Sequence, residues 1–390
     1  MRIVHVITRL IVGGAQENTI LCCQDLIRDF GDEVLLVTGP ALGPEGSLAE
    51  DALNRNIPMV TIGALRRNIN PWRDAGSYHQ IKRVLRDFNP EVVHTHSAKA
   101  GVLGRFAAAH LGVPAIVHTV HGAPFHAYQN AISRRFFQLI EKQAARRCHQ
   151  FVSVADAMTD IMVNARIAHR EKFITLYSGM DVDLFLNSDS TRKKVRRQLG
   201  YDSDQIVVGK VARLFDLKGH SDVIRAARAI VDRQPKVQFL FVGDGILKDS
   251  LRSEISRNNL DKHFQFTGLV TPQRVAELMG AMDLVVHASL REGLARALPQ
   301  ALIAGKPVVS YDVDGAREVV VQGVTGYLVP PCDVVQLGEA IGTLVGDQES
   351  RRRMGQEGSR QLRGLFSHQA MTESLRKLYQ SLLRGPSPPG

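Results

Sequence analysis

The stretch Ile206-Val-Val-Gly-Lys-Val-Ala-Arg-Leu-Phe-Asp-Leu-Lys-Gly219 shows how this chain is built. Its first six residues are mostly β-branched and apolar, which predicts a buried strand over 206–211. Arg213 and the pair Lys218-Gly219 follow in the next loop, where a helix is expected to begin. A strand that is apolar on both faces, followed by a loop and a helix, is one βα unit of a parallel sheet.

Similar β-branched runs recur in two series, and segments with helical periodicity separate them. The first series consists of Ile3–Ile7, Val34–Thr38, Val92–Thr95, Ala115–Val120 and Phe151–Val154. The second consists of Ile206–Val211, Val237–Val242, Phe264–Thr267, Leu284–His287 and Pro307–Ser310. Two series of alternating strands and helices predict two parallel sheets, each covered by helices on both faces.

The chain has 390 residues, which is enough for two to three domains. Apolar periodicity fades over 180–204, so we expect a hinge region between an N-terminal domain over 1–179 and a C-terminal domain over 205–367. A helix over about 368–384 is expected to pack back on the first domain. The end, 385–390, is Gly-Pro-Ser-Pro-Pro-Gly, which cannot form a helix and is expected to be disordered.

Composition and charge exclude several classes of protein. Hydrophobic residues make up 44% and charged residues 23%, so intrinsic disorder, collagen and coiled coils are excluded. The net charge of +10 is spread evenly, without a basic tail, which favours anionic small molecules or an anionic membrane surface over nucleic acid. The four cysteines show no CxxC spacing, which indicates a reducing compartment, and we expect a cytoplasmic protein.

The segment from Arg134 to Arg147 has two interpretations. It holds five cations and one acid with Phe136, Phe137, Leu139 and Ile140 among them, which fits a basic amphipathic helix on a membrane surface. It also fits a helix whose apolar stripe packs on the sheet, and we favour this second interpretation.

Polar residues and glycines follow several predicted strands, at the edge where open α/β sheets bind ligands. Gly13 and Gly14 follow the first strand, and a helix is expected from Glu17 onward. The motif is not GxGxxG, and no acidic residue follows the second strand, so a nicotinamide-dependent dehydrogenase is disfavoured. His121 follows the strand Ala115–Val120 and can hydrogen-bond a sugar hydroxyl.

His94 and His96 form an HxH pair at a strand end. No third ligand of convincing spacing is found in the sequence, so we expect no metal there. Ordinary buried histidines are the alternative for these positions.

In the second series, Arg213 and Lys218 together suit a pyrophosphate, although two ordinary loop cations are the alternative. Gly243 and Gly268 lie at strand-to-helix turns. Glu292 is expected in the loop after Leu284–His287, where it can accept hydrogen bonds from sugar hydroxyls. The N–H groups of Gly293 and Leu294 can cap a phosphate.

Taken in order, these residues resemble the retaining glycosyltransferases of family 4, whose GT-B fold has two Rossmann-like domains with parallel sheets facing across a cleft. The matching segments are Gly13-Gly14-Ala15, His121-Gly122, Ser178-Gly179-Met180-Asp181, Arg213 with Lys218-Gly219, Gly243-Asp244-Gly245, Phe266-Thr267-Gly268-Leu269, Glu292-Gly293, Asp314-Gly315 with Glu318, and Gly323 with Gly326.

The resemblance implies an enzyme that moves a sugar, with retention, from a nucleotide diphosphate sugar to a surface glycan or lipid-linked acceptor. A UDP-sugar is favoured, and no further cofactor is expected. The resemblance gives Arg213 and Lys218 to the diphosphate, Glu292 to the donor sugar, and His121 to the sugar and acceptor side.

The remaining positions follow the same family pattern with one important departure. The turn at Gly243 flanks the base, Gly268 and Leu269 contact it through backbone, and Gly13 and Gly14 lie near the reaction centre. Position 300 holds Gln where the family has a second Glu that binds the ribose hydroxyls. Gln300 lacks the charge that strengthens such bonds, so weaker nucleotide binding is expected.

Asp-x-Asp strings occur at 181–183, 202–204 and 312–314, but two fall inside family motifs and one in the expected hinge, so we expect no essential metal. A double displacement needs two carboxylates about 5 Å apart, and no convincing second one is found. This fits the front-face mechanism proposed for the family.

The alternatives to a glycosyltransferase are a catalytically weak nucleotide-sugar-binding partner protein and a nucleotide-sugar epimerase of related fold.

Overall fold

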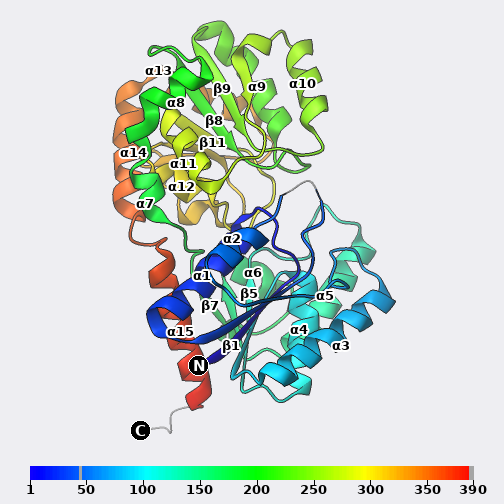
Figure 1. Cartoon of the computed structure of the whole chain (residues 1–390). Helices are drawn as coiled ribbons and strands as arrows, with labels where there is room; N and C mark the ends of the chain where they lie inside the picture. The colour runs from blue at the N-terminus through cyan, green and yellow to red at the C-terminus, as the bar shows by residue number, and fades with distance from the viewer. Residues whose placement is uncertain (44–45, 386–390) are drawn as a thin grey trace. The chain divides into compact units, whose positions relative to one another are not determined.

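The structure is a computed structural model that describes residues 1–43 and 46–385 (Figure 1). The chain divides into two compact units. Unit 1 consists of Met1–Met180 together with the chain from Ser367 onward, and unit 2 consists of Asp181–Phe366. The expected disordered tail, 385–390, lies outside the described residues except for Gly385.

Unit 1 is built on a seven-stranded, all-parallel sheet with the order β3-β2-β1-β4-β5-β6-β7. Its strands are β1 (Arg2–Ile7), β2 (Glu33–Thr38), β3 (Met59–Thr61), β4 (Val92–His96), β5 (Ala115–Val120), β6 (Gln150–Ser153) and β7 (Phe173–Thr175). The two three-residue edge strands, β3 and β7, are absent from the predicted series. The central order is that of a Rossmann fold.

Helices cover both faces of this sheet. Helix α1 packs with α15 against one face, and α3 packs with α4 against the other. The helices of unit 1 are α1 (Gly14–Phe30), α2 (Ala49–Asn54), α3 (Pro71–Phe88), α4 (Ala98–His110), α5 (Ala131–Ala145), α6 (Asp156–Asn164), the 3₁₀ turn η1 (Arg170–Lys172) and α15 (His368–Arg384). Helix α1 begins at Gly14, three residues before the predicted start at Glu17.

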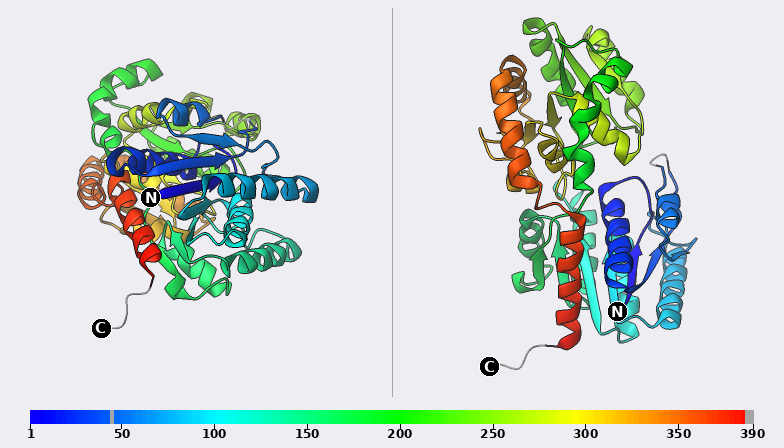
Figure 2. Two further views of the ribbon diagram at one scale, coloured as in Figure 1. Left: turned by 60° about the horizontal axis from the view of Figure 1, so that its bottom comes forward. Right: turned by 60° about the vertical axis from the view of Figure 1, so that its left-hand side comes forward.

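The C-terminal helix α15 lies beside α1, although more than 330 residues separate them in sequence (Figure 2). Asp25 of α1 is fully buried and accepts hydrogen bonds from His368 Nδ1 at 2.6 Å and Thr372 Oγ1 at 3.0 Å. Arg376 pairs with the buried Asp32 at 2.8 Å. Because buried carboxylates need such partners, these contacts fix α15 on unit 1.

Unit 2 repeats the architecture with a six-stranded parallel sheet of order β10-β9-β8-β11-β12-β13. Its strands are β8 (Ile206–Val211), β9 (Val237–Val242), β10 (Phe264–Phe266), β11 (Leu284–His287), β12 (Val308–Tyr311) and β13 (Gly326–Val329). The prediction of two parallel sheets in Rossmann-like domains is therefore confirmed.

The core of unit 2 joins β8, β9 and β11 to α9, α10 and α13. The helices of unit 2 are α7 (Val182–Leu186), η2 (Ser188–Thr191), α8 (Arg192–Leu199), α9 (His220–Arg233), α10 (Lys248–Arg257), η3 (Asp261–His263), α11 (Pro272–Ala281), α12 (Ala297–Ile303), η4 (Asp314–Glu318), α13 (Val334–Gly346) and α14 (Gln348–Leu362).

The structure differs from the expectation of a separate hinge region over 180–204. Residues from Asp181 onward belong to unit 2, where α7, η2 and α8 pack on α11. Arg192 and Arg196 bind the carboxylate of Asp283 at 2.6 and 3.2 Å. The apolar pattern of this segment is weak because ion pairs and backbone hydrogen bonds hold much of it in place.

Helix α5 also departs from the favoured prediction that its apolar stripe packs on the sheet. In its C-terminal half Glu141, Ala144 and Ala145 are buried where α5 packs with α4, and the Glu141 carboxylate pairs with the buried Arg105 of α4 at 2.6 Å. Closer to its N-terminus, Ile132 and Leu139 are 85% and 61% exposed. No helix in the described part of the chain has the length and apolarity needed to cross a bilayer.

Candidate active site

The loops after β8 and β11 carry the charged residues that the sequence singled out in unit 2. These two strands are neighbours in the sheet, so their carboxyl ends lie at the same edge. The amide of Leu290 donates to the carbonyl of Leu217 at 2.8 Å and joins the two loops directly. Lys218 and Glu292, which are 74 residues apart in sequence, are thereby brought together.

Lys218 and Glu292 form the central contact of this edge, with Nζ 2.5 Å from Oε1. His287 Nε2 lies 3.4 Å from the same oxygen. Burial pushes the pKa of Glu292 upward, but Lys218 and His287 outweigh it and hold the pKa well below its usual range. A carboxylate with such a low pKa is a weak base, and it can accept hydrogen bonds from sugar hydroxyls.

Asp314 supports Glu292 from the next loop. The backbone N–H of Glu292 donates to Asp314 Oδ2 at 2.6 Å, and the amide of Gly315 donates to the carbonyl of Gly293 at 3.2 Å. Burial raises the pKa of Asp314, which the hydrogen bond from Glu292 partly offsets. In the sequence Asp314 is part of a family motif, and this second carboxylate beside Glu292 was not predicted.

Arg213 is exposed at the start of the loop after β8, and its guanidinium lies 5.2 Å from the centre of the Phe215 ring. The next residue, Leu214, is fully buried and donates its amide to the carbonyl of Asp244 at 2.9 Å. This bond ties the Arg213 loop to the turn after β9.

Two glycines of unit 2 have φ angles in the left-handed region and no room for a side chain. A Cβ on Gly219, at φ 64°, would lie 1.9 Å from the carbonyl oxygen of Ala288. A Cβ on Gly243, at φ 138°, would lie 2.2 Å from that of Ala212. The Gly243 amide donates to the Gly268 carbonyl at 3.2 Å, which brings these two predicted turns together beside the exposed Leu269.

The remaining predicted positions of unit 2 lie around α12. Gly293 and Leu294 are buried in the loop before this helix. Gln300 lies in the first turn of α12 and is 9% exposed.

A group of buried polar side chains near the Lys218–Glu292 pair was not predicted. Lys210 on β8 is 1% exposed, and its Nζ has no hydrogen-bond partner within residues 1–43 and 46–385. Burial, and then the charge of Lys218, lower the pKa of Lys210 to about 7. The signal in the sequence is a lysine inside an otherwise apolar strand, Ile206–Val211.

In unit 1 the predicted residues lie at the carboxyl ends of β1 and β5. Gly13 precedes α1 in an extended conformation, and the carbonyl of Gly13 accepts from the amide of Glu17 at 3.0 Å. His121 directly follows β5, and its Nε2 lies 3.1 Å from His96 Nδ1 at the end of β4.

The structure supplies a third histidine that the sequence analysis did not find beside the HxH pair. His5 on β1 pairs in register with His94 on β4, and one ring nitrogen from each of His5, His94 and His96 lies within 4.8 Å of the others. These side chains fit a soft divalent metal in ligand type. Their nitrogens also bond one another and nearby hydroxyls, with His5 Nδ1 3.0 Å from His96 Nε2.

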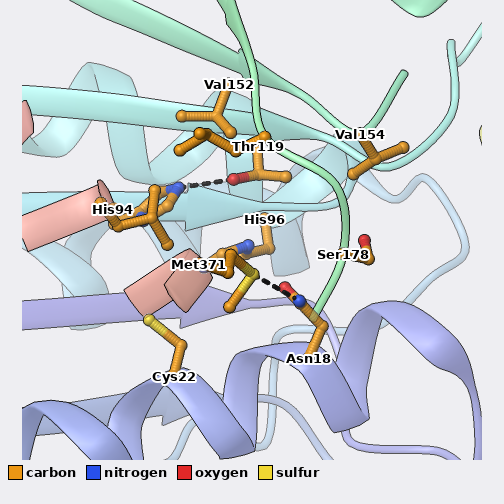
Figure 3. Close-up of a pocket in the computed structure, with 11 residues that line it drawn as sticks. Asn18, Cys22, His94, His96, Thr119, Val152, Val154, Ser178 and Met371 are labelled. Atoms are coloured by element: carbon orange, nitrogen blue, oxygen red, sulfur yellow. Dashed lines mark hydrogen bonds between the residues drawn. The ribbon is translucent and has the colours of Figure 1, made fainter. Parts of the chain in front are cut away.

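Figure 3 shows a small cavity beside these histidines, between the sheet and the helices α1 and α15. His94 Nε2 bonds Thr119 Oγ1 at 2.7 Å, and the Asn18 amide donates to Met371 Sδ at 2.9 Å. Its open volume of about 10 Å³ is roughly that needed by one water molecule. The cavity therefore does not hold a sugar or a nucleotide.

Comparison with known proteins defines the class. Residues 12–184 match the model of Glycosyltransferase Family 4, and residues 191–361 match that of Glycosyl transferases group 1. The chain therefore belongs to the family 4-type glycosyltransferases with the GT-B fold.

Two curated relatives cover most of the chain. One is the UDP-Gal:alpha-D-GlcNAc-diphosphoundecaprenol alpha-1,3-galactosyltransferase of Escherichia coli, 27% identical over 76% of this chain and 77% of that protein. Another is the capsular polysaccharide biosynthesis glycosyltransferase CapM of Staphylococcus aureus, 25% identical over 82% of this chain and 84% of that protein.

Solved structures show the same fold. Anabaena HepE in complex with UDP and glucose superimposes with a TM-score of 0.82 at 23% identity, covering 98% of this chain and 100% of that one. Sucrose-phosphate synthase from Thermosynechococcus elongatus gives 0.81 at 18% identity, covering 99% and 100%.

Proposed function

We propose that this glycosyltransferase moves a sugar from a UDP-sugar to a surface glycan or its lipid-linked precursor, with retention of the anomeric configuration. The observation that carries the proposal is the contact of 2.5 Å between Lys218 and Glu292 at the edge of the unit 2 sheet. An ammonium and a carboxylate lie side by side there, which supports the assignment of Lys218 to the diphosphate and of Glu292 to sugar hydroxyls.

The leaving diphosphate gains negative charge in the transition state, and cations aimed at it lower the barrier. Lys218 and Arg213 are assigned to this role, with the amides of Gly293 and Leu294 as further donors. Because these groups compensate the diphosphate, the reaction is proposed to need no resident metal.

The state of Glu292 bears on the route by which retention is proposed to occur. A carboxylate paired with Lys218 and held at low pKa is a poor nucleophile, which speaks against a covalent glycosyl-enzyme intermediate. We assign Glu292 to the hydroxyls of the donor sugar and the deprotonation of the acceptor to the leaving diphosphate.

The donor assignment draws on the relatives. The Escherichia coli relative is named for UDP-Gal, and HepE was solved with UDP and glucose. The turns at Gly243 and Gly268 with Leu269 are assigned to the base, and Gln300 to the ribose. In unit 1, His121 is assigned to the sugar and acceptor, and Gly13 and Gly14 to backbone contacts near the reacting atoms.

The acceptor assignment rests on the names of the same relatives, one with a diphosphoundecaprenol-linked acceptor and one in capsular polysaccharide biosynthesis. The segment 132–139 of α5 supports peripheral contact with an anionic membrane. There Ile132, Phe136 and Leu139 are 85%, 46% and 61% exposed next to Arg134 and Arg135.

Flotation with vesicles tests the membrane contact. The variant with Ile132→Ser and Leu139→Ser is expected to lose most of its binding to vesicles rich in phosphatidylserine, because the exposed apolar surface is removed. Val335→Ser on α13, a residue that is 71% exposed in unit 2, is the matched control. Equal flotation of all proteins would contradict the assignment.

The activity is tested by screening UDP-, GDP- and ADP-sugars for thermal stabilisation and then for transfer to a lipid-linked acceptor, with NMR of the product linkage. We expect UDP-sugars to stabilise the protein, a retained anomeric configuration, and unchanged activity after dialysis against EDTA. Binding without transfer would support a nucleotide-sugar-binding partner, and an epimerised nucleotide sugar would support an epimerase.

A further inference from the structure

Three imidazoles of unit 1 form a hydrogen-bonded chain that ends at His121. His5 Nδ1 lies 3.0 Å from His96 Nε2, and His96 Nδ1 lies 3.1 Å from His121 Nε2. The chain runs from the fully buried His5 to the partly exposed His121 at the carboxyl edge of the sheet. Because His96 uses one nitrogen for each neighbour, the proton positions of the three rings depend on one another.

Burial favours the neutral form of the two inner rings. Burial lowers the pKa of His5 to about 3, and burial together with His94 lowers that of His96 well below its usual range. A neutral imidazole has one N–H and one lone pair. Each contact therefore needs an N–H on one ring and a lone pair on the other. A chain of neutral rings then has two possible arrangements: all N–H groups donate toward His121, or all donate toward His5.

The buried end of the chain distinguishes the two arrangements. One of them puts the His5 proton on Nε2, an atom for which the described residues provide no hydrogen-bond partner. A buried N–H without an acceptor is rarer in folded proteins than an unused acceptor. The other arrangement is therefore favoured: His5 Nδ1–H donates to His96 Nε2, and His96 Nδ1–H donates to His121 Nε2.

We propose that His5 and His96 are positioning residues that hold His121 as the tautomer protonated on Nδ1. In this arrangement His96 occupies the Nε2 lone pair of His121, so the ring carries its N–H on Nδ1 and has no lone pair left to accept a proton from a sugar hydroxyl. His121 is then a hydrogen-bond donor and not a general base. The inference rests on the proposed function for the assignment of His121 to the sugar.

His94 provides a matched control within the same cluster. It lies on β4 with His96, is fully buried, and has its ring centre 4.3 Å from that of His96. Its two nitrogens bond hydroxyls instead. One bonds Tyr379 Oη at 2.5 Å, and the other bonds Thr119 Oγ1 at 2.7 Å, as Figure 3 shows for Thr119. His94 is therefore outside the chain of shared protons.

NMR of the full chain labelled with ¹⁵N-histidine reads the tautomers directly, with His121→Asn used to assign the His121 signals. We expect His121 to carry its proton on Nδ1 in the wild type. His96→Met and His5→Met are expected to give a mixture of His121 tautomers, although His5 is two hydrogen bonds away from His121. His94→Met is expected to leave the His121 tautomer unchanged.

Several results would overturn the proposal. One is a wild-type His121 protonated on Nε2, a measurement that does not depend on whether any variant folds. Another is a His121 tautomer that stays the same in folded His5→Met and His96→Met proteins. Stoichiometric zinc in the purified wild type, lost in His94→Met, would also overturn it, because the metal would replace the shared proton between His5 and His96.

Transfer assays add a second readout. His121→Asn, which keeps an amide donor, is expected to retain transfer to within about tenfold of the wild type, and His121→Ala is expected to lose more than that. His96→Met is expected to lower kcat by about five- to tenfold, the worth of one neutral hydrogen bond, with KM little changed. Full activity of His121→Ala would refute the assignment of His121 to the sugar while leaving the NMR result intact.

Discussion

In unit 2 the loops after β8 and β11 bring the ammonium of Lys218 and the carboxylate of Glu292 into contact at 2.5 Å. In unit 1 the strands β1 and β4 and the residue after β5 bring imidazole nitrogens together at 3.0 and 3.1 Å. Both sites lie at the carboxyl edge of a parallel sheet, where loops converge. Unit 2 offers charge, which suits a diphosphate, and unit 1 offers hydrogen bonds of defined direction, which suit the uncharged hydroxyls of sugars. The same fold thus carries a charged site in one unit and a neutral one in the other.

The largest effect is expected when the cations of the charged site in unit 2 are removed. Lys218→Met is expected to lower kcat by about 10²–10³-fold, and combination with Arg213→Met should nearly abolish turnover, because the leaving diphosphate loses its compensating charges. Steady-state kinetics of sugar transfer measures the effect.

Lys236→Met, which removes a 70% exposed lysine paired with Asp204, is the control for loss of positive charge and should keep wild-type kinetics. If the Lys218 variant retained more than a tenth of the activity, the assignment of charge compensation to unit 2 would be wrong.

The carboxylate of Glu292 provides the second test. Glu292→Gln keeps the shape and removes the charge, so kcat/KM is expected to fall about 10- to 100-fold, the worth of a hydrogen bond to a charged group. Kinetics with the identified donor measures it, and Glu339→Gln on the exposed side of α13 is the control. An unchanged kcat/KM would remove Glu292 from the donor site.

The buried Lys210 provides a third test, in which the free energy of unfolding is measured as a function of pH. Its pKa is lowered from 10.5 to about 7, so between these values the unfolded chain binds one more proton than the folded chain. The free energy of unfolding should therefore rise with pH by about 1.4 kcal/mol per unit over this range. The stabilisation from this residue is lost as the pH falls toward 7.

Lys210→Met removes this dependence. Relative to the wild type, the variant should gain in stability as the pH is lowered from 9 to 7, by up to about 2.7 kcal/mol, measured by urea unfolding. Parallel pH profiles of the two proteins would show that Lys210 is not desolvated in the folded state.

The smallest expected effect concerns Gln300. Gln300→Glu introduces the carboxylate that the family pattern has at this position, so UDP is expected to bind about three- to tenfold more tightly through a charge-assisted bond to the ribose. Calorimetric titration measures the affinity. Gln300→Met, which keeps the volume without a polar group, should bind UDP more weakly, and equal affinities in all three proteins would contradict the ribose assignment.

The charged site of unit 2 could be predicted from the sequence more fully than the histidine cluster of unit 1. Arg213, Lys218 and Glu292 stand out because each follows a β-branched strand, and such loops meet at one edge of a parallel sheet. His5 gave no such signal, because a single histidine inside an apolar strand reads as part of the core. Only the register of β1 against β4 places it beside His94 and His96.

The sequence by itself determined the two series of βα units and the order of the site motifs, because strand and helix periodicity and turn glycines are local properties. Tertiary structure decided which side chains meet: Lys218 with Glu292, His5 with His96, and α15 with α1. It also decided that 181–204 folds with unit 2 and that part of α5 stays exposed. These outcomes depend on strand order and long-range packing, which no local pattern in the sequence encodes.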